Sequence, residues 1–157
     1  MKKEDLPNRI SVFPLSNAIF FPRTILPLNI FEDRYLQLVE DCMKEGRLFG
    51  MVQPRNSEGT SPEVYSVGCL GKIISFNETS DKRFIINLSG IIRFRIKREL
   101  EKSKMYRNFE VDYSEFLSDL EEKQKLVEII KIEDKIKTLN EIISFNLVDF
   151  QENKTVQ

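Results

Sequence analysis

The fold is decided by residues 13–35, FPLSNAIFFPRTILPLNIFEDRY. This stretch is apolar and contains three X-Pro steps, at Pro14, Pro22 and Pro27. The residue before a proline is biased towards extended geometry, and proline lacks the N–H group that a central strand needs. We therefore expect short extended pieces at strand ends, edges or bulges, joined by tight bends. A helix is expected to start directly after them.

Alternating apolar residues and turn-forming residues predict the other elements. Extended segments are expected at residues 9–13, 18–21, 25–30, 48–53, 64–76, 83–88, 91–98 and 106–113, with one early helix at residues 32–45. Ser89-Gly90 is interpreted as the break between two paired strands. Gly68 and Gly71, three positions apart inside a strand, predict a bulge or the close approach of another backbone segment. The pattern indicates an α+β, mostly β, fold in which about six short strands form a small, partly closed barrel.

The early helix is amphipathic. Its apolar residues fall on one stripe, which predicts that the helix packs onto the sheet. These residues are Phe31, Tyr35, Leu38, Val39, Cys42 and Met43. Gly46 is expected to end the helix, because glycine readily adopts the left-handed conformation that follows many helix C-termini.

The composition changes after residue 115. Residues 117–150 contain neither proline nor glycine, and apolar residues recur there at intervals of three and four, which predicts one or two C-terminal amphipathic helices. The residues that define this spacing are Leu126, Val127, Ile130, Ile136, Leu139, Ile143 and Leu147. We therefore divide the chain into a β domain, residues 9–113, and a C-terminal helical segment, residues 114–150.

The overall composition limits the class of protein. The 157 residues are 41% hydrophobic and 31% charged, which is enough apolar material for a packed core. A net charge of −1 argues against a largely electrostatic partner such as duplex DNA. Residues 1–9 are polar and no apolar run is long enough to cross a bilayer, so we expect a cytoplasmic protein with no membrane partner. Cys42 and Cys69 are expected to be buried, reduced thiols.

Several motifs resemble a known family. The run FPLSNAIFFP at residues 13–22, followed by LPLNIFEDRYLQLVEDC at residues 26–42, resembles the start of the Lon substrate-binding domain, the N-terminal domain of Lon proteases. GCLGKI and LSGIIRFRI, further along the chain, also match the family pattern. The resemblance implies a PUA-like pseudo-barrel for residues 9–113, a shortened helical bundle after it, and a stand-alone domain without the ATPase and protease domains of Lon. Arg23 stands where the family commonly has glycine, and Asp33 where it often has proline.

The sequence offers little for catalysis. It contains no histidine, which excludes Ser-His-Asp and Cys-His units. No GxxxxGK[ST] motif occurs, and the carboxylates and two distant cysteines show no metal-ligand spacing. We therefore predict a chain that is not an enzyme, with no catalytic residues, no cofactor and no metal.

The first functional hypothesis is protein binding. The resemblance implies recognition of exposed apolar segments of unfolded or tagged proteins, which requires accessible apolar surface or an unpaired strand edge. The candidate binding residues are Phe20, Phe21, Ile25 and Leu26, whose alternative role is to fill the core. The expected partners are such apolar segments, with a protease or chaperone if the chain is an adaptor or regulator of proteolysis. A shortened helical bundle would also leave apolar surface for a second copy, giving a homodimer through the C-terminal helices.

The alternative hypothesis is RNA binding, because PUA-like barrels include RNA-binding members. The candidate face is a basic strand formed by Arg93, Arg95, Lys97 and Arg98. No aromatic residues interleave with these cations as in a stacking platform, so a solvated strand face is the simpler interpretation. Salt separates the two hypotheses: RNA binding weakens with salt and with charge reversal of this strand, whereas apolar peptide binding tolerates both.

Overall fold

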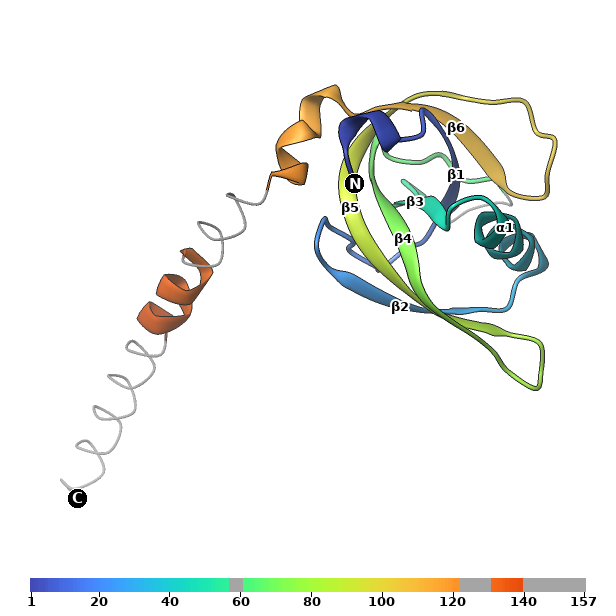
Figure 1. The fold of residues 1–157 in the computed structure, drawn as a ribbon, viewed down its shortest axis with the longest axis horizontal. Helices are drawn as coiled ribbons and strands as arrows, with labels where there is room; N and C mark the ends of the chain where they lie inside the picture. The colour runs from blue at the N-terminus through green and yellow to red at the C-terminus, as the bar shows by residue number, and fades with distance from the viewer. Residues whose placement is uncertain (57–60, 122–130, 140–157) are drawn as a thin grey trace, which may run out of the picture. The chain divides into compact units, whose positions relative to one another are not determined.

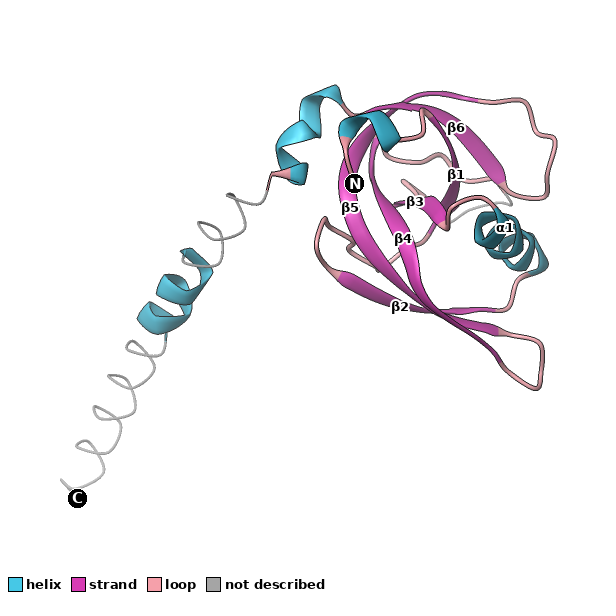
Figure 2. Cartoon of the chain, in the orientation of Figure 1, coloured by secondary structure: helices cyan, strands magenta, loops and turns pink. Residues whose placement is uncertain are grey.

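The computed structural model describes residues 1–56, 61–121 and 131–139 (Figure 1). Six strands form one sheet: β1 Arg9–Pro14, β2 Ile25–Ile30, β3 Leu48–Val52, β4 Val67–Glu78, β5 Phe84–Glu99 and β6 Arg107–Asp112. One α-helix, α1 Asp33–Lys44, follows β2, and two 3-10 helices, η1 Lys3–Asp5 and η2 Ser114–Leu120, flank the sheet in the sequence (Figure 2). The expected mostly β fold with one early helix is confirmed.

The sheet closes on itself through β5. The strand order is β2-β5-β4-β3-β1-β6, and β5 also pairs with β6. The first part of β5 pairs with β2 and its last part pairs with β6. Strands β5, β4, β3, β1 and β6 therefore form a closed barrel, with β2 attached beside the first part of β5 (Figure 1). Only the β1–β3 pairing is parallel among the described strands.

The break predicted at Ser89-Gly90 is wrong, because β5 runs through this position as a single strand. Gly90 instead contacts the bend that leads into β2. Its N–H donates to the Thr24 carbonyl at 2.9 Å, and its own carbonyl accepts the Arg23 N–H at 2.8 Å. A Cβ at Gly90 would lie 2.0 Å from the Phe21 carbonyl oxygen. This glycine therefore permits the close approach of two backbone segments and does not form a turn.

The other elements agree with the sequence prediction to within a few residues at their ends. The bulge predicted from Gly68 and Gly71 is confirmed, because the β4–β5 register shifts between Leu70 and Gly71. The extended piece predicted at residues 18–21 is wrong, since these residues belong to an irregular loop. The backbone leaves extended geometry just before them, at Asn17, which has a φ of 61°.

Helix α1 packs against the barrel through most of the predicted stripe, with Tyr35, Leu38, Val39 and Cys42 buried and Met43 packed beside them. Phe31 is the exception, because it precedes the helix and is exposed. Gly46 ends the helix as predicted: it has a φ of 92°, and the Arg47 N–H reaches back to the Cys42 carbonyl at 2.7 Å. These are the features of a Schellman-type helix end.

The core consists of two clusters of buried side chains. The first lies between α1 and the sheet and includes Leu38, Phe49 and Ile86. The second is formed by strands on the other part of the barrel and includes Ile92 and Phe94, which are fully buried. Apolar side chains of η2, namely Phe116, Leu117 and Leu120, pack against this second cluster. The first compact unit accordingly extends from Met1 to Leu120.

The second unit, Glu121–Gln157, is described by itself. Its residues 131–139 are helical. Ile132, Ile136 and Leu139 are each exposed by more than half and recur at intervals of four and three, which places them on one side of the helix. Residues 122–130 and 140–150 of the predicted helical segment lie outside the described residues.

Candidate functional site

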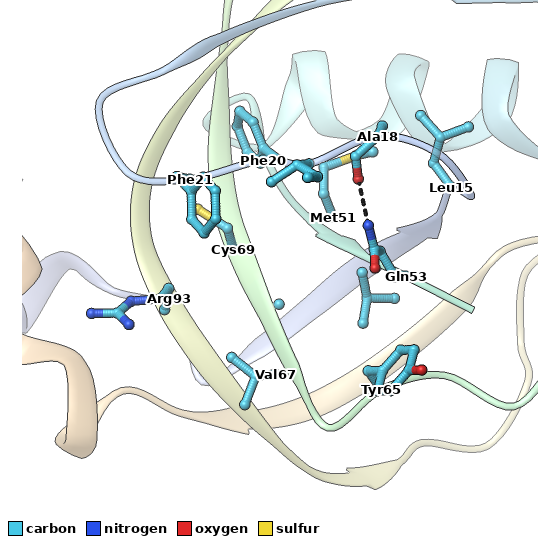
Figure 3. A pocket seen from close by; sticks show the side chains of 13 residues that line it. Leu15, Ala18, Phe20, Phe21, Met51, Gln53, Tyr65, Val67, Cys69 and Arg93 are labelled. Carbon is cyan, nitrogen blue, oxygen red and sulfur yellow. Dashed lines mark hydrogen bonds between the residues drawn. The ribbon is translucent and has the colours of Figure 1, made fainter. Parts of the chain in front are cut away.

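The connection between β1 and β2, residues 15–24, forms an irregular loop that we call the proline loop. Its second half is held by a local turn, in which the Thr24 hydroxyl donates to the Phe21 carbonyl at 2.7 Å. Its first half is tied to the end of β3 by Gln53, whose side-chain amide donates to the Ala18 carbonyl at 3.0 Å (Figure 3). Because the Arg23 N–H also donates to the Gly90 carbonyl of β5 at 2.8 Å, both halves of the loop are tied to the barrel, although the loop does not pair as a strand.

A pocket of about 420 Å³ opens between the proline loop and strands β3 and β4, and we call it the apolar pocket (Figure 3). The strand side of this pocket is a cross-strand pair, because Met51 of β3 lies opposite Cys69 of β4 in the sheet register. The full lining is Leu15, Ala18, Ile19, Phe20, Phe21, Met51, Val52, Gln53, Tyr65, Val67, Gly68, Cys69 and Arg93.

The apolar pocket has a buried floor and an exposed rim. Met51 and Cys69 are almost completely buried, whereas Ile19 and Phe21 are 70% and 55% exposed. Burial raises the pKa of the Cys69 thiol to about 12, so the thiol stays neutral and acts as a small apolar group. Exposed large apolar side chains around a concave apolar surface are typical of a site that accepts apolar groups from a partner.

The four predicted binding residues have three different locations. Phe20 and Phe21 line the apolar pocket. Ile25 is exposed on β2 and is not part of the pocket lining. Leu26 is half-buried and packs against the core cluster beneath α1. Two of the four candidates, Phe20 and Phe21, therefore belong to the apolar pocket, and the two candidates on β2 lie outside it.

The strand half of the apolar pocket was missed by sequence reasoning. Met51, Tyr65 and Val67 come from separate strands and a loop, and only the β3–β4 pairing brings them together. One local signal was present at Gly68, where close backbone approach was predicted. A Cβ there would lie 2.5 Å from the Met51 carbonyl oxygen, so the absence of a side chain shapes the pocket wall.

The basic strand of β5 is paired with carboxylates. The ion pairs are Arg93–Asp119 at 2.7 Å, Arg95–Glu115 at 2.8 Å and Arg98–Glu110 at 2.8 Å. Of the four predicted cations, Lys97 alone forms no ion pair within the part of the chain that the structure describes. Each pairing reduces the positive potential that a phosphate backbone would meet, so this geometry does not favour the RNA hypothesis.

Asp119 connects three parts of the structure. Its carboxylate accepts the Arg93 backbone N–H at 3.0 Å and two guanidinium N–H groups of Arg93 at 2.9 Å and 2.7 Å. Its backbone carbonyl accepts from the Arg23 guanidinium of the proline loop at 2.8 Å. Burial by itself would raise the pKa of Asp119, but the hydrogen bonds and charge of Arg93 lower it below its usual value. Asp119 is therefore ionised at neutral pH and joins η2 to β5 and to the proline loop.

Within residues 1–56, 61–121 and 131–139, no group of three or more potential metal ligands is gathered. No helix in those ranges is long and apolar enough to cross a membrane. Cys42 and Cys69 are buried free thiols, as predicted, and burial raises the pKa of each to about 12.

These features define a class of protein: a small β-barrel module whose accessible apolar pocket lies beneath an irregular loop. The family follows from the sequence. Residues 9–120 match the family model of the ATP-dependent protease La (Lon) substrate-binding domain. This match covers more than half of the chain, and the chain belongs to that family.

Relatives of known name agree with this assignment. The chain is 30% identical over 115 residues to Lon protease 2 of Syntrophobacter fumaroxidans and 28% identical over 115 residues to Lon protease 2 of Myxococcus xanthus. In both cases the match covers 71% of this chain and 14% of the relative, so the chain corresponds to a small part of each. Among solved structures, the Lon N-terminal domain protein from Xanthomonas campestris is 30% identical with a TM-score of 0.56, covering 67% of this chain and 59% of that one.

Proposed function

We propose that this chain is a non-catalytic module that binds exposed apolar segments of unfolded or tagged proteins in the apolar pocket. The observation that carries the proposal is the exposed rim formed by Ile19 and Phe21 above a buried floor. A partner that inserts an apolar side chain there removes apolar surface from water on both sides. Burial of one large apolar side chain stabilises a complex by about 1.5–3 kcal/mol.

The family supports the choice of ligand. A domain described as substrate-binding in an ATP-dependent protease recognises polypeptides, and an unfolded chain is the polypeptide that exposes apolar side chains. We further propose that the chain acts as an adaptor or regulator in proteolysis or protein quality control, with a protease or chaperone as its second partner. A homodimer through the C-terminal helices is part of the same proposal, because it would present two pockets at once.

The test measures binding of a labelled, reduced and carboxymethylated protein, which stays unfolded, by fluorescence anisotropy. Phe21→Ser and Ile19→Ser are expected to weaken binding about tenfold or more, since each removes an exposed apolar contact at the rim. Binding by the wild-type chain is expected to persist at high salt, because apolar contacts are not screened by ions.

The matched control is Ile74→Ser. Ile74 is an exposed apolar residue of β4, with 51% of its surface accessible, and it does not line the apolar pocket. This variant is expected to bind like the wild type. Equal losses in Ile74→Ser and Phe21→Ser would show that general surface hydrophobicity, and not the pocket, causes binding. Binding that disappears at high salt would contradict an apolar mode.

A further inference from the structure

Strand β2 has an edge that no other described strand covers. In the described part of the chain, β2 pairs only with β5, in an antiparallel register from Ile25 opposite Ser89 to Ile30 opposite Phe84. Each described strand of the closed barrel has at least two neighbours, and β5 has three. An uncovered edge presents backbone N–H and C=O groups that can pair with another extended chain.

The hydrogen bonding of Gly90 shows which β2 residues face this edge. Gly90 lies one position beyond the start of the β2–β5 register and donates its N–H to the Thr24 carbonyl at 2.9 Å. In an antiparallel pair, residues that bond the neighbouring strand alternate with residues that do not. Starting from Thr24, every second residue therefore forms its backbone hydrogen bonds with β5. The residues between them, whose backbone groups face outward, are Ile25, Pro27 and Asn29.

The position of Pro27 agrees with this count. Proline has no N–H to donate, so within a sheet it suits an edge strand where that side faces solvent. The three outward-facing residues are all exposed. Among the described residues, their backbone groups take part in no hydrogen bond outside the β2–β5 pairing. The free edge therefore offers two N–H donors, of Ile25 and Asn29, and three carbonyl acceptors.

A groove of about 450 Å³ lies beside this edge. Its lining includes Pro27 and Asn29 of β2, Pro14 at the end of β1 and Ser16 of the proline loop. Leu15 is the one described residue that lines both this groove and the apolar pocket. The free edge thus has space next to it for a polypeptide, and this space shares Leu15 with the apolar pocket.

We propose that an extended polypeptide segment binds in this groove and adds to the sheet as a strand next to β2. The groups offered are backbone donors and acceptors at the strand spacing, and the occupant that matches them is another extended backbone. The proposal rests on the proposed function, because the segment belongs to the same unfolded partner whose apolar side chain enters the pocket. It adds a second contact that depends on the partner's backbone and not on its side chains.

A second copy of the chain is a poorer occupant than a foreign segment. If two β2 strands pair antiparallel about their centres, the two Pro27 residues lie close to each other, and each removes a donor from the new ladder. Proline on an edge strand is a known protection against such self-pairing. A foreign segment without proline supplies all of its own N–H and C=O groups.

The first experiment compares Asn29→Pro with Asn29→Ala. Asn29→Pro removes the outward N–H at a position with the same orientation as Pro27, whereas Asn29→Ala keeps it. The probe is a labelled peptide of alternating valine and threonine, flanked by lysines, measured by fluorescence anisotropy. We expect Asn29→Pro to weaken binding tenfold or more and Asn29→Ala to change it less than twofold. Equal binding by both variants would overturn the proposal.

The second experiment uses the wild-type chain and does not depend on the folding of a variant. The same peptide is made with N-methyl groups on its valines or on its threonines. An added strand uses alternate amides, so one methylated set should abolish binding and the other should be tolerated. Equal effects of the two sets would contradict strand addition.

The outcomes separate this proposal from the proposed function. If Phe21→Ser weakens binding of the unfolded protein but Asn29→Pro does not, and both methylated peptides bind equally, the pocket binds substrates and the edge does not. If the edge tests succeed and Phe21→Ser has no effect, the edge binds alone and the pocket proposal fails. If Asn29→Pro removes a dimer of the chain and leaves peptide binding unchanged, the occupant is a second copy and the proposal is wrong.

Discussion

Arg23 has a φ of 65°, in the left-handed region that costs an ordinary residue about 1–2 kcal/mol. Glycine, which the resemblance to the Lon family leads us to expect at this position, adopts this conformation without steric cost. Here the cost is offset by the guanidinium, which donates to the Asp119 carbonyl at 2.8 Å. Asp33 is the first residue of α1, a position where proline is favoured and where an acidic residue also suits the helix dipole.

Asp119→Asn is expected to lower the free energy of unfolding at pH 7 by about 1–3 kcal/mol, because it weakens partly buried hydrogen bonds to a charged partner. The pKa of Asp119 is lower in the folded chain than its usual value near 4. Its contribution to stability is therefore present above that value and is lost as the pH falls through the lowered pKa. Urea denaturation of both proteins should show a difference that shrinks below about pH 4.

The control for this prediction is Glu115→Gln. Glu115 pairs with Arg95 on the same η2–β5 contact, but both partners are exposed. Exposed ion pairs contribute little because solvent screens them. Glu115→Gln should therefore cost less stability than Asp119→Asn. A larger loss in Glu115→Gln, or a difference for Asp119→Asn that does not depend on pH, would contradict the role assigned to Asp119.

At the scale of elements, sequence reasoning succeeded where the signal was local. Helix α1 and most strands follow from apolar periodicity and from glycine or proline at their ends. The prediction failed at Gly90, because a single sequence does not distinguish a glycine that permits close backbone approach from a glycine in a turn. It also missed the strand half of the apolar pocket, since Met51 and Cys69 become neighbours only through the β3–β4 register. Long-range pairing is the information that the local pattern lacks.

The edge of β2 gives an element-scale prediction at Pro27. Pro27→Thr restores an outward N–H at the centre of the free edge and replaces proline with a residue that favours strands. We expect this variant to self-associate more strongly than the wild type, because two β2 edges can then form a continuous ladder. Sedimentation velocity over a range of concentrations measures the change. Leu26→Thr is unsuitable as a control because Leu26 packs on the core, so Asn29→Thr serves instead.

Asn29→Thr introduces the same threonine side chain on the same outer face without altering the number of backbone donors. It is expected to remain in the wild-type association state. If Pro27→Thr and Asn29→Thr self-associate equally, the added threonine side chain and not the restored N–H is responsible. If neither self-associates, Pro27 does not protect the edge.

At the scale of the whole molecule, the compact unit Met1–Leu120 contains the closed barrel, α1, both core clusters and the apolar pocket. A fragment of residues 1–120 is therefore expected to fold alone with the same urea midpoint as the full chain. It should also keep its affinity for the unfolded probe, since Ile19 and Phe21 lie within it. If the fragment folds but no longer binds the probe, the binding site lies in the second unit.

The second unit gives the last prediction, on association. Ile132, Ile136 and Leu139 form an exposed apolar stripe on the helix at residues 131–139, and water-exposed stripes of this kind are stabilised by pairing with another helix. We expect the full chain to form a homodimer and the 1–120 fragment to be monomeric in sedimentation equilibrium. Replacing the three stripe residues with lysine should give a monomer. Lys137→Ala, on the same helix but on the side away from the stripe, should leave the dimer intact, and a dimer that survives the lysine replacements would require an interface elsewhere in the chain.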